Sequence, residues 1–69
     1  MISPTIIGER LLNLLTEKNV SREEEALAVG VSSSAVAMYE TGRRIPRDTV
    51  KLRIAEYFGE SIESIFFAQ

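Results

Sequence analysis

Five basic side chains lie within eleven consecutive positions in the second half of the chain, and they are the residues best suited to bind a ligand. They are Arg43, Arg44, Arg47, Lys51 and Arg53, and Asp48 is the one acidic residue between them. Cations at this density attract anions such as the phosphates of a nucleic-acid backbone. The plainer interpretation is a solvated basic surface, or pairing with glutamates one helical turn away. Because the net charge is −2, the molecule must be polarised into a basic edge and an acidic remainder.

The composition narrows the possible chemistry. The 69 residues contain no cysteine and no histidine, which excludes disulfides, the usual zinc sites and most nucleophile–base arrangements. We therefore expect no enzyme, no metal and no cofactor, and no small-molecule ligand is evident. No apolar run is long enough for a membrane span, and the N-terminus lacks the pattern of a signal peptide. The expectation is one cytoplasmic domain that covers residues 1–69.

The basic residues follow two short helices predicted between residues 21 and 42. Ser21 and Glu24 have the spacing of a capping box at the start of the first helix. Gly30 predicts a left-handed end of that helix, and Ser32 predicts a cap for the next one, which runs to about Glu40. Helical spacing gives this second helix a small, mostly polar outward face. Its residues are Ser33, Ser34, Ala37, Met38 and Thr41.

Three further helices complete the prediction of a single all-α bundle. One covers about residues 4–18, a fourth begins at a cap on Asp48 and ends before Gly59, and the last follows a cap on Ser61. The apolar residues predicted to bury this last helix are Ile62, Ile65 and Phe66. The chain shows no strand pattern, no internal repeat and no interdomain linker.

Several short motifs follow one another in an order that is typical of a family. They are IGERL in the first helix, SREEEA at the start of the second, VGVSSSAVAMYETGRR across the turn and the third, and RIAEYFGESIESIF near the end. With these motifs the chain resembles the Cro/phage-repressor-like, XRE-type helix-turn-helix domains over residues 6–67. The resemblance implies a five-helix lambda-repressor-like fold whose second and third helices form the helix-turn-helix. It also implies double-stranded DNA as the partner.

The resemblance implies particular contact residues. Phosphate contacts fall on Arg22, Thr41, Arg43 and Arg44, and base-reading positions fall on Ser32, Ser33, Ser34, Ala37 and Met38. The base-reading set contains no Arg, Lys, Asn or Gln, so the bidentate pairs with guanine or adenine are absent. Serine can bond to almost any base edge, and Ala37 and Met38 can touch a thymine methyl group. Specificity is therefore expected largely from DNA shape and dimer spacing. The alternative for the serines is a helix cap followed by solvated side chains.

The resemblance further implies a transcriptional regulator that binds a two-fold operator as a homodimer. We expect a repressor of phage, mobile-element or bacterial genes. The residues expected near the dimer interface are Ile65, Phe66 and Phe67. The alternative is a protein-interaction module, such as an antitoxin or a regulator's partner, which the acidic net charge and the weak base-reading set favour. The sequence leaves open activation against repression, and a complete regulator against the N-terminal domain of a longer one.

Three residues depart from the family pattern. Glu25 and Lys51 stand where the family usually has core leucines, and Leu15 replaces an arginine that in many members pairs with a glutamate at the position of Glu40. Because the two leucine sites lie near each other in this fold, one hypothesis is a partly buried ion pair between Glu25 and Lys51. The alternative is that both side chains reach solvent from the edge of the core. Without the arginine, Glu40 needs another donor. The candidates are Arg10, Arg43 and a backbone N–H group.

Overall fold

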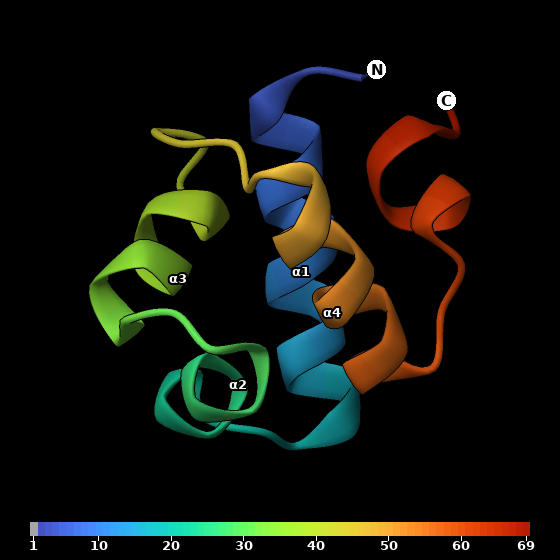
Figure 1. Cartoon of the computed structure of the whole chain (residues 1–69). Helices are drawn as coiled ribbons and strands as arrows, with labels where there is room; N and C mark the ends of the chain where they lie inside the picture. The colour runs from blue at the N-terminus through green and yellow to red at the C-terminus, as the bar shows by residue number, and fades with distance from the viewer. Residues whose placement is uncertain (1) are drawn as a thin grey trace.

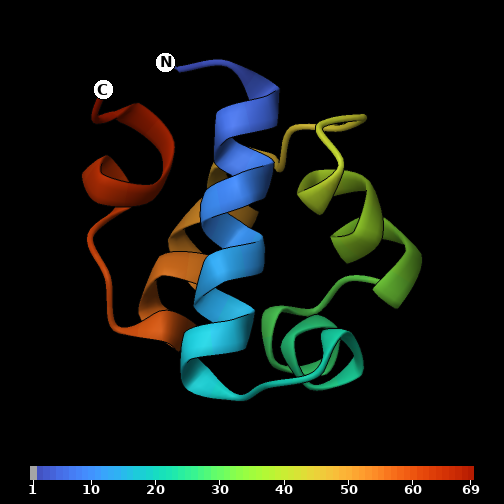
Figure 2. The same ribbon diagram turned by 180° about the vertical axis from the view of Figure 1, so that it is seen from behind.

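Five helices follow one another in the computed structural model, which describes residues 2–69. They are α1 Pro4–Lys18, α2 Arg22–Val29, α3 Ser33–Glu40, α4 Asp48–Phe58 and the π-helix η1 Glu63–Phe67. No strand occurs in this part of the chain. α1 and α4 lie in the middle of the molecule, with α2 and α3 to one side and η1 to the other (Figure 1 and Figure 2). The prediction of an all-α, five-helix fold is confirmed.

Serine side chains begin three of these helices, as predicted. The capping box of α2 is complete, since Ser21 Oγ accepts from the Glu24 N–H at 3.1 Å and Glu24 Oε1 accepts from the Ser21 N–H at 3.0 Å. Ser32 Oγ accepts from the Ala35 N–H at 3.0 Å, and Ser3 caps α1 in the same way. Each cap satisfies a backbone donor in the first turn and stabilises its helix by about 1 kcal/mol.

The turn between α2 and α3 depends on Gly30. Its φ of +85° lies in the left-handed region, where a residue with a Cβ is strained. The N–H groups of Gly30 and Val31 donate to the carbonyl of Ala26 at 2.8 and 3.0 Å, which closes α2. The chain then turns sharply enough for Ser32 to start α3. The helix-turn-helix predicted for residues 21–42 is therefore present.

The start of α4 differs from the prediction. Asp48 is the first residue of the helix, while Arg47 occupies the cap position and makes no side-chain cap hydrogen bond. The carboxylate of Asp48 lies 3.5 Å from Lys51 Nζ instead. An acidic residue in the first turn of a helix still interacts favourably with the helix dipole, so Asp48 stabilises the same end by another route.

The last helix also differs in kind. η1 is a π-helix, and the Ala68 N–H donates to the Glu63 carbonyl at 2.7 Å. Ser61 was predicted to cap this helix, but the cap position is Ile62, which makes no side-chain cap hydrogen bond. The Ser61 hydroxyl still accepts from the Ser64 N–H at 3.0 Å, one residue before that position. Helices of this width are rare in proteins and usually span a single turn. The buried residues of η1 are Ile65 and Phe66, and Ile62 packs against the core.

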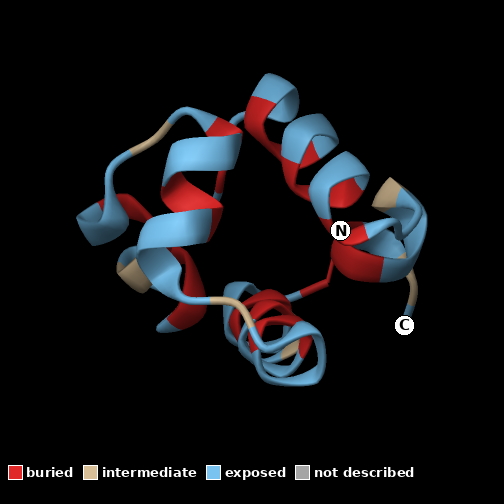
Figure 3. Cartoon of the chain, turned by 90° about the horizontal axis from the view of Figure 1, so that it is seen from below, coloured by how far each residue is buried: buried red, intermediate tan, exposed pale blue. Residues whose placement is uncertain are grey.

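One apolar core joins all five helices. Buried residues occupy the inner faces of the helices and exposed residues the outer faces (Figure 3). The largest fully buried apolar side chains are Phe66, Ile7, Leu11, Ile54, Val29 and Val36. Ile2, just before α1, also lies in the core, which the sequence did not indicate. Within residues 2–69 no helix has the length and apolar character needed to cross a membrane.

α1 and α3 approach each other closely at Gly8. A Cβ atom at this position would lie 2.3 Å from the carbonyl oxygen of Glu40 and 2.9 Å from that of Tyr39. Both oxygens belong to the backbone, so neither can move aside unless α3 shifts. The missing side chain at Gly8 therefore sets how closely α3 packs on α1, and with it the position of the helix-turn-helix on the rest of the fold.

Candidate nucleic-acid interface

The outward face of α3 forms the floor of two adjoining surface hollows. One is lined by Ser21, Arg22, Glu23, Ser33, Ser34 and Ala37. The other is lined by Ser34, Ala37, Met38, Thr41 and Arg43. The two hollows share Ser34 and Ala37, so they form one continuous surface along α3. This surface brings together four of the five predicted base-reading residues and three of the four predicted phosphate residues.

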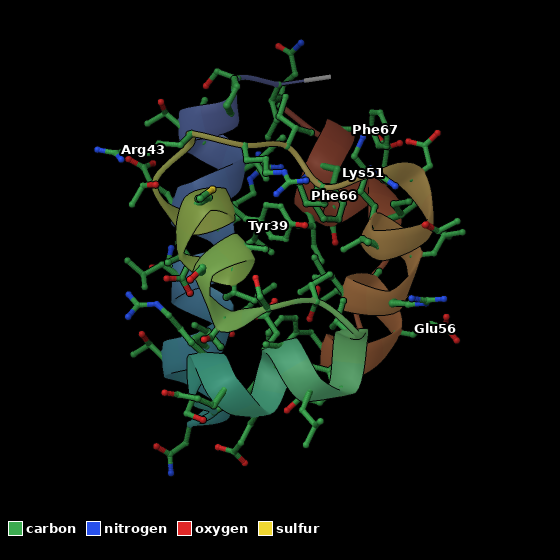
Figure 4. The ribbon with its side chains drawn as sticks, turned by 60° about the vertical axis from the view of Figure 1, so that its left-hand side comes forward. Tyr39, Arg43, Lys51, Glu56, Phe66 and Phe67 are labelled. Carbon is green, nitrogen blue, oxygen red and sulfur yellow. The ribbon has the colours of Figure 1, made fainter. Side chains whose placement is uncertain are left out.

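The side chains on this surface are accessible. Ser33, Ser34 and Met38 are exposed, and Ala37 is half-buried. Arg43 extends away from the molecule at the end of α3 (Figure 4). Because the serine and alanine side chains are short, another molecule can approach the backbone of α3 closely along this line.

Ser32 and Arg44 line a separate hollow between α3, the loop that follows it and the start of α4. Arg47 and Arg53 line the same hollow, which we call the basic hollow. Arg53 Nη1 also donates to the carbonyl of Val29 at 3.4 Å, at the end of α2. The structure therefore brings together three arginines, Arg44, Arg47 and Arg53. The sequence predicted a phosphate contact for Arg44 alone, and left the other two between phosphate contact and a solvated basic surface.

Two hydroxyl groups differ in what they can still donate. The hydroxyl of Ser32 accepts a hydrogen bond in its cap, which leaves its proton available to an outside acceptor. The Thr41 hydroxyl instead donates to the carbonyls of Ala37 and Met38, at 3.1 and 3.2 Å. A phosphate oxygen accepts hydrogen bonds but has none to donate. The proton of Thr41 is therefore engaged within α3 at a position predicted for phosphate contact.

Arg22 has a protein partner that the sequence did not indicate. Its Nε lies 2.5 Å from Oε1 of Glu40, in a charge-assisted hydrogen bond between the start of α2 and the end of α3. The side chain of Glu40 is 3% exposed and that of Arg22 is 53% exposed, so the pair runs from the interior to the surface. Neither Arg10 nor Arg43 is the donor, and Arg10 instead donates to two carbonyls of η1. Arg22 thus supplies the donor for Glu40 that the resemblance assigns to the position of Leu15.

Glu25 lies inside the helix-turn-helix. The residue is 1% exposed, and neither of its carboxyl oxygens has a hydrogen-bond partner among the described residues. Burial raises the pKa of Glu25 to about 7, and the nearby carboxylate of Glu40 adds to the rise. Glu40 Oε2 is also buried without a partner. No third potential metal ligand joins these two carboxyl groups within residues 2–69. We call Glu25, Glu40 and Arg22 the carboxyl cluster.

The hypothesised ion pair between Glu25 and Lys51 is absent from the structure. Lys51 is 7% exposed, and its Nζ lies 5.8 and 5.4 Å from the ring centroids of Phe66 and Phe67, in addition to its contact with Asp48 (Figure 4). The alternative was also wrong, because Glu25 does not reach solvent. Lys51 therefore joins α4 to η1 through cation–π contacts, which typically contribute about 0.5–2 kcal/mol each.

Of the three residues predicted near a dimer interface, Phe67 is the one at the surface. Ile65 and Phe66 are 2% and 0% exposed within the single chain, whereas Phe67 is 39% exposed. A contact between two copies through η1 would therefore use Phe67 directly. Ile65 and Phe66 would hold η1 in place from beneath.

Comparison with known proteins places this arrangement in a family. A family model described as "Helix-turn-helix" matches residues 11–65. The chain belongs to the XRE-type helix-turn-helix family. None of the curated proteins searched matches the chain.

Solved structures agree with this assignment. The restriction-modification controller protein C.AhdI from Aeromonas hydrophila is 28% identical, with a TM-score of 0.85 over 91% of this chain and 96% of that chain. The clp gene regulator ClgR from C. glutamicum is 22% identical, with a TM-score of 0.82 over 94% of this chain and 84% of that chain, and shares the fold. This helix-turn-helix protein is accordingly a DNA-binding transcription regulator.

The pair of Arg22 and Glu40 was missed, although the sequence of this helix-turn-helix protein contains one signal for it. Arg22 is the first residue of α2, where the positive end of the helix dipole disfavours a cation. The glutamates that follow Arg22 interact favourably with the positive end of the dipole, whereas Arg22 does not, so its presence there needs a separate explanation. Together with the absence of a basic residue at Leu15, this points to a partner for Glu40.

Proposed function

We propose that this helix-turn-helix protein binds double-stranded DNA as a homodimer, with α3 in the major groove, and represses the genes whose operators it occupies. The observation that carries the proposal is the continuous surface along α3, with accessible short side chains and an arginine at each end, Arg22 and Arg43. An α-helix of about 10–12 Å diameter fits a major groove about 12 Å wide. Short side chains favour deep entry of α3.

Base recognition on this surface would be modest. Ser33 and Ser34 can exchange hydrogen bonds with most base edges, and Met38 can pack on a thymine methyl group. The Ser32 proton adds one donor from the neighbouring basic hollow. Since no bidentate reader is present, the sequence preference would depend strongly on how easily the operator takes the required shape.

Phosphate contacts would supply most of the affinity. Arg43 after the end of α3 and Arg22 at the start of α2 lie at the two ends of the continuous surface along α3, and the basic hollow lies beside this surface. Arginines on both sides of the helix can hold the two strands that border the major groove. This arrangement explains how a chain of net charge −2 can bind a polyanion, because the cations are concentrated where the DNA would lie.

Homodimer formation is the second part of the proposal. η1 and α3 lie on opposite sides of α1 and α4 (Figure 1 and Figure 2). A contact between two copies through the exposed Phe67 would therefore leave the continuous surface along α3 open to DNA. Two copies could then place their α3 helices in successive major grooves, about 34 Å apart. The similarity to C.AhdI, a restriction-modification controller protein, supports a regulatory role. The rival proposal, a protein-interaction module, draws on the acidic net charge.

Selection of bound duplexes from a random DNA pool tests this function. We expect enriched sites with two-fold symmetry, half-sites about one helical turn apart, and weak preference at most positions. Placing the selected site across a promoter should lower transcription when the protein is present. Failure to enrich any duplex at low salt would favour the protein-interaction module.

Replacing Arg43 with alanine should weaken binding to all duplexes alike. Loss of one phosphate contact lowers the slope of log affinity against log salt by about 1, and the affinity near 0.1 M salt by up to about tenfold. Titrations of the selected and a scrambled duplex at several salt concentrations provide the measurement. Lys18→Ala removes the same charge from the exposed end of α1, outside the hollows, and should change the slope less. A loss confined to the selected duplex would instead make Arg43 a base reader.

A further inference from the structure

We propose that Glu25 takes up a proton when the protein binds DNA, so that binding is tighter at mildly acidic than at mildly alkaline pH. The inference rests on the proposed function, because it requires a DNA phosphate at Arg22. It is carried by the geometry of the carboxyl cluster. Glu25 and Glu40 are both buried, three of their four carboxyl oxygens lack a partner, and the fourth is bonded to Arg22.

Arg22 links this buried group to the proposed DNA surface. Its Nε is held by Glu40 in the interior, while the side chain lines the hollow beside α3 and is 53% exposed. A guanidinium carries five N–H donors, so Arg22 can keep Glu40 and still bond a phosphate. The cation that is bonded to the buried carboxylate of Glu40 is thus the one that the DNA would share.

Three cations on the neighbouring helices have contacts of their own. On α4, Arg53 bonds the Val29 carbonyl at the far end of α2, and Lys51 lies against Asp48 and the rings of η1. On α1, Arg10 donates to two carbonyls of η1. Glu40 on α3 is the charged group that acts on Glu25. The charge that acts on Glu25 is therefore that of Glu40, and Arg22 is bonded to Glu40.

A phosphate at Arg22 would change that balance in a definite direction. It adds a negative charge beside the carboxyl cluster and shares the cation that is bonded to Glu40, so a negative charge on Glu25 becomes less favourable. At about 10 Å and an effective dielectric constant of about 20, one charge shifts a pKa by about one unit. The pKa of Glu25 would rise further on binding, and a group whose pKa rises takes up protons.

The amino-acid composition allows the pH dependence of DNA binding to be assigned to Glu25. Burial already raises the pKa of Glu25 to about 7, so the residue is partly protonated in the free protein and can respond near neutral pH. The chain has no histidine and no cysteine, the side chains that otherwise titrate in this range. Tighter binding as pH falls from about 8 to about 6 would therefore report on Glu25, beside the terminal amino group that every variant retains.

The experiment compares the wild type with Glu25→Gln and Glu25→Leu on the duplex recovered by selection. From about pH 8 to about pH 6, wild-type affinity should rise about fivefold more than that of either variant. Calorimetry in two buffers of different ionisation enthalpy should show proton uptake by the wild type that both variants lack. Glu56→Gln, the same change at an exposed site on α4, should behave as the wild type (Figure 4).

The possible results separate the coupling at Glu25 from DNA binding itself. Loss of the pH dependence and of the proton uptake in both variants supports the coupling, and the leucine variant guards against a folding defect from a buried amide. Equal pH dependence in all four proteins overturns the inference and leaves DNA binding intact. Absence of binding at every pH overturns the proposed function, and the inference with it.

Discussion

Replacing Glu25 with leucine is expected to raise the free energy of unfolding by about 3 kcal/mol near pH 8. In the folded chain the pKa of this carboxyl is raised from 4.5 to about 7, and the residue is 1% exposed without a hydrogen-bond partner. Above that pH the fold must hold a buried charge that the unfolded chain exposes to water. Leucine carries no charge and is the residue type that the resemblance leads us to expect at this position.

The direction of the pH effect provides the measurement. Between pH 4.5 and about 7 the folded protein holds a proton that the unfolded chain releases, so wild-type stability falls as pH rises through this window. Denaturant titrations near both ends should show this fall in the wild type and a smaller one in Glu25→Leu. Glu56→Leu makes the same change at an exposed site and should keep the wild-type profile. A destabilised Glu25→Leu with an unchanged m-value would mean that the carboxyl has a stabilising partner.

Replacing Gly8 with alanine should destabilise the protein by about 3 kcal/mol or more. The added Cβ would lie 2.3 Å from the Glu40 carbonyl oxygen, and backbone atoms of α3 cannot rotate away. A domain of this length has a total stability of roughly 3–10 kcal/mol, so the variant should be close to unfolding. Thermal denaturation should show a fall in melting temperature of at least about 10 °C.

The control for this prediction is Glu9→Ala, an exposed position next to Gly8 on α1. Alanine has the highest helix propensity, so this variant should melt within a few degrees of the wild type. If Gly8→Ala also melted near the wild type, α3 would be free to move outward on α1. DNA binding should then change instead, because the groove-binding helix would be displaced.

The local structure of this chain could be predicted because its signals act over a few residues. Ser21 with Glu24 and the left-handed Gly30 each determine one helix end through bonds to neighbouring backbone groups. The outward face of α3 follows from helical spacing in the same way. Asp48 was misplaced by one residue, since an acidic residue suits both the cap and the first turn.

The carboxyl cluster could not be predicted, because it depends on packing between helices. A glutamate in the first turn of α2 is favourable for the helix dipole whether it is exposed or buried, so the type of residue at Glu25 did not indicate its position. The sequence also offered several cations for Glu40. Which of them reaches it depends on the crossing of α2 and α3. The same packing determines that Lys51 lies on the rings of η1.

The bond between Arg22 and Glu40 also explains how an apolar residue can occupy position 15. The resemblance assigns the cation for this glutamate to the position of Leu15, on α1, whereas here it comes from the first residue of α2. Without Arg22 the buried carboxylate would lose its partner, at a cost of about 3–5 kcal/mol. Because α2 supplies the charge, position 15 carries a leucine that packs in the core.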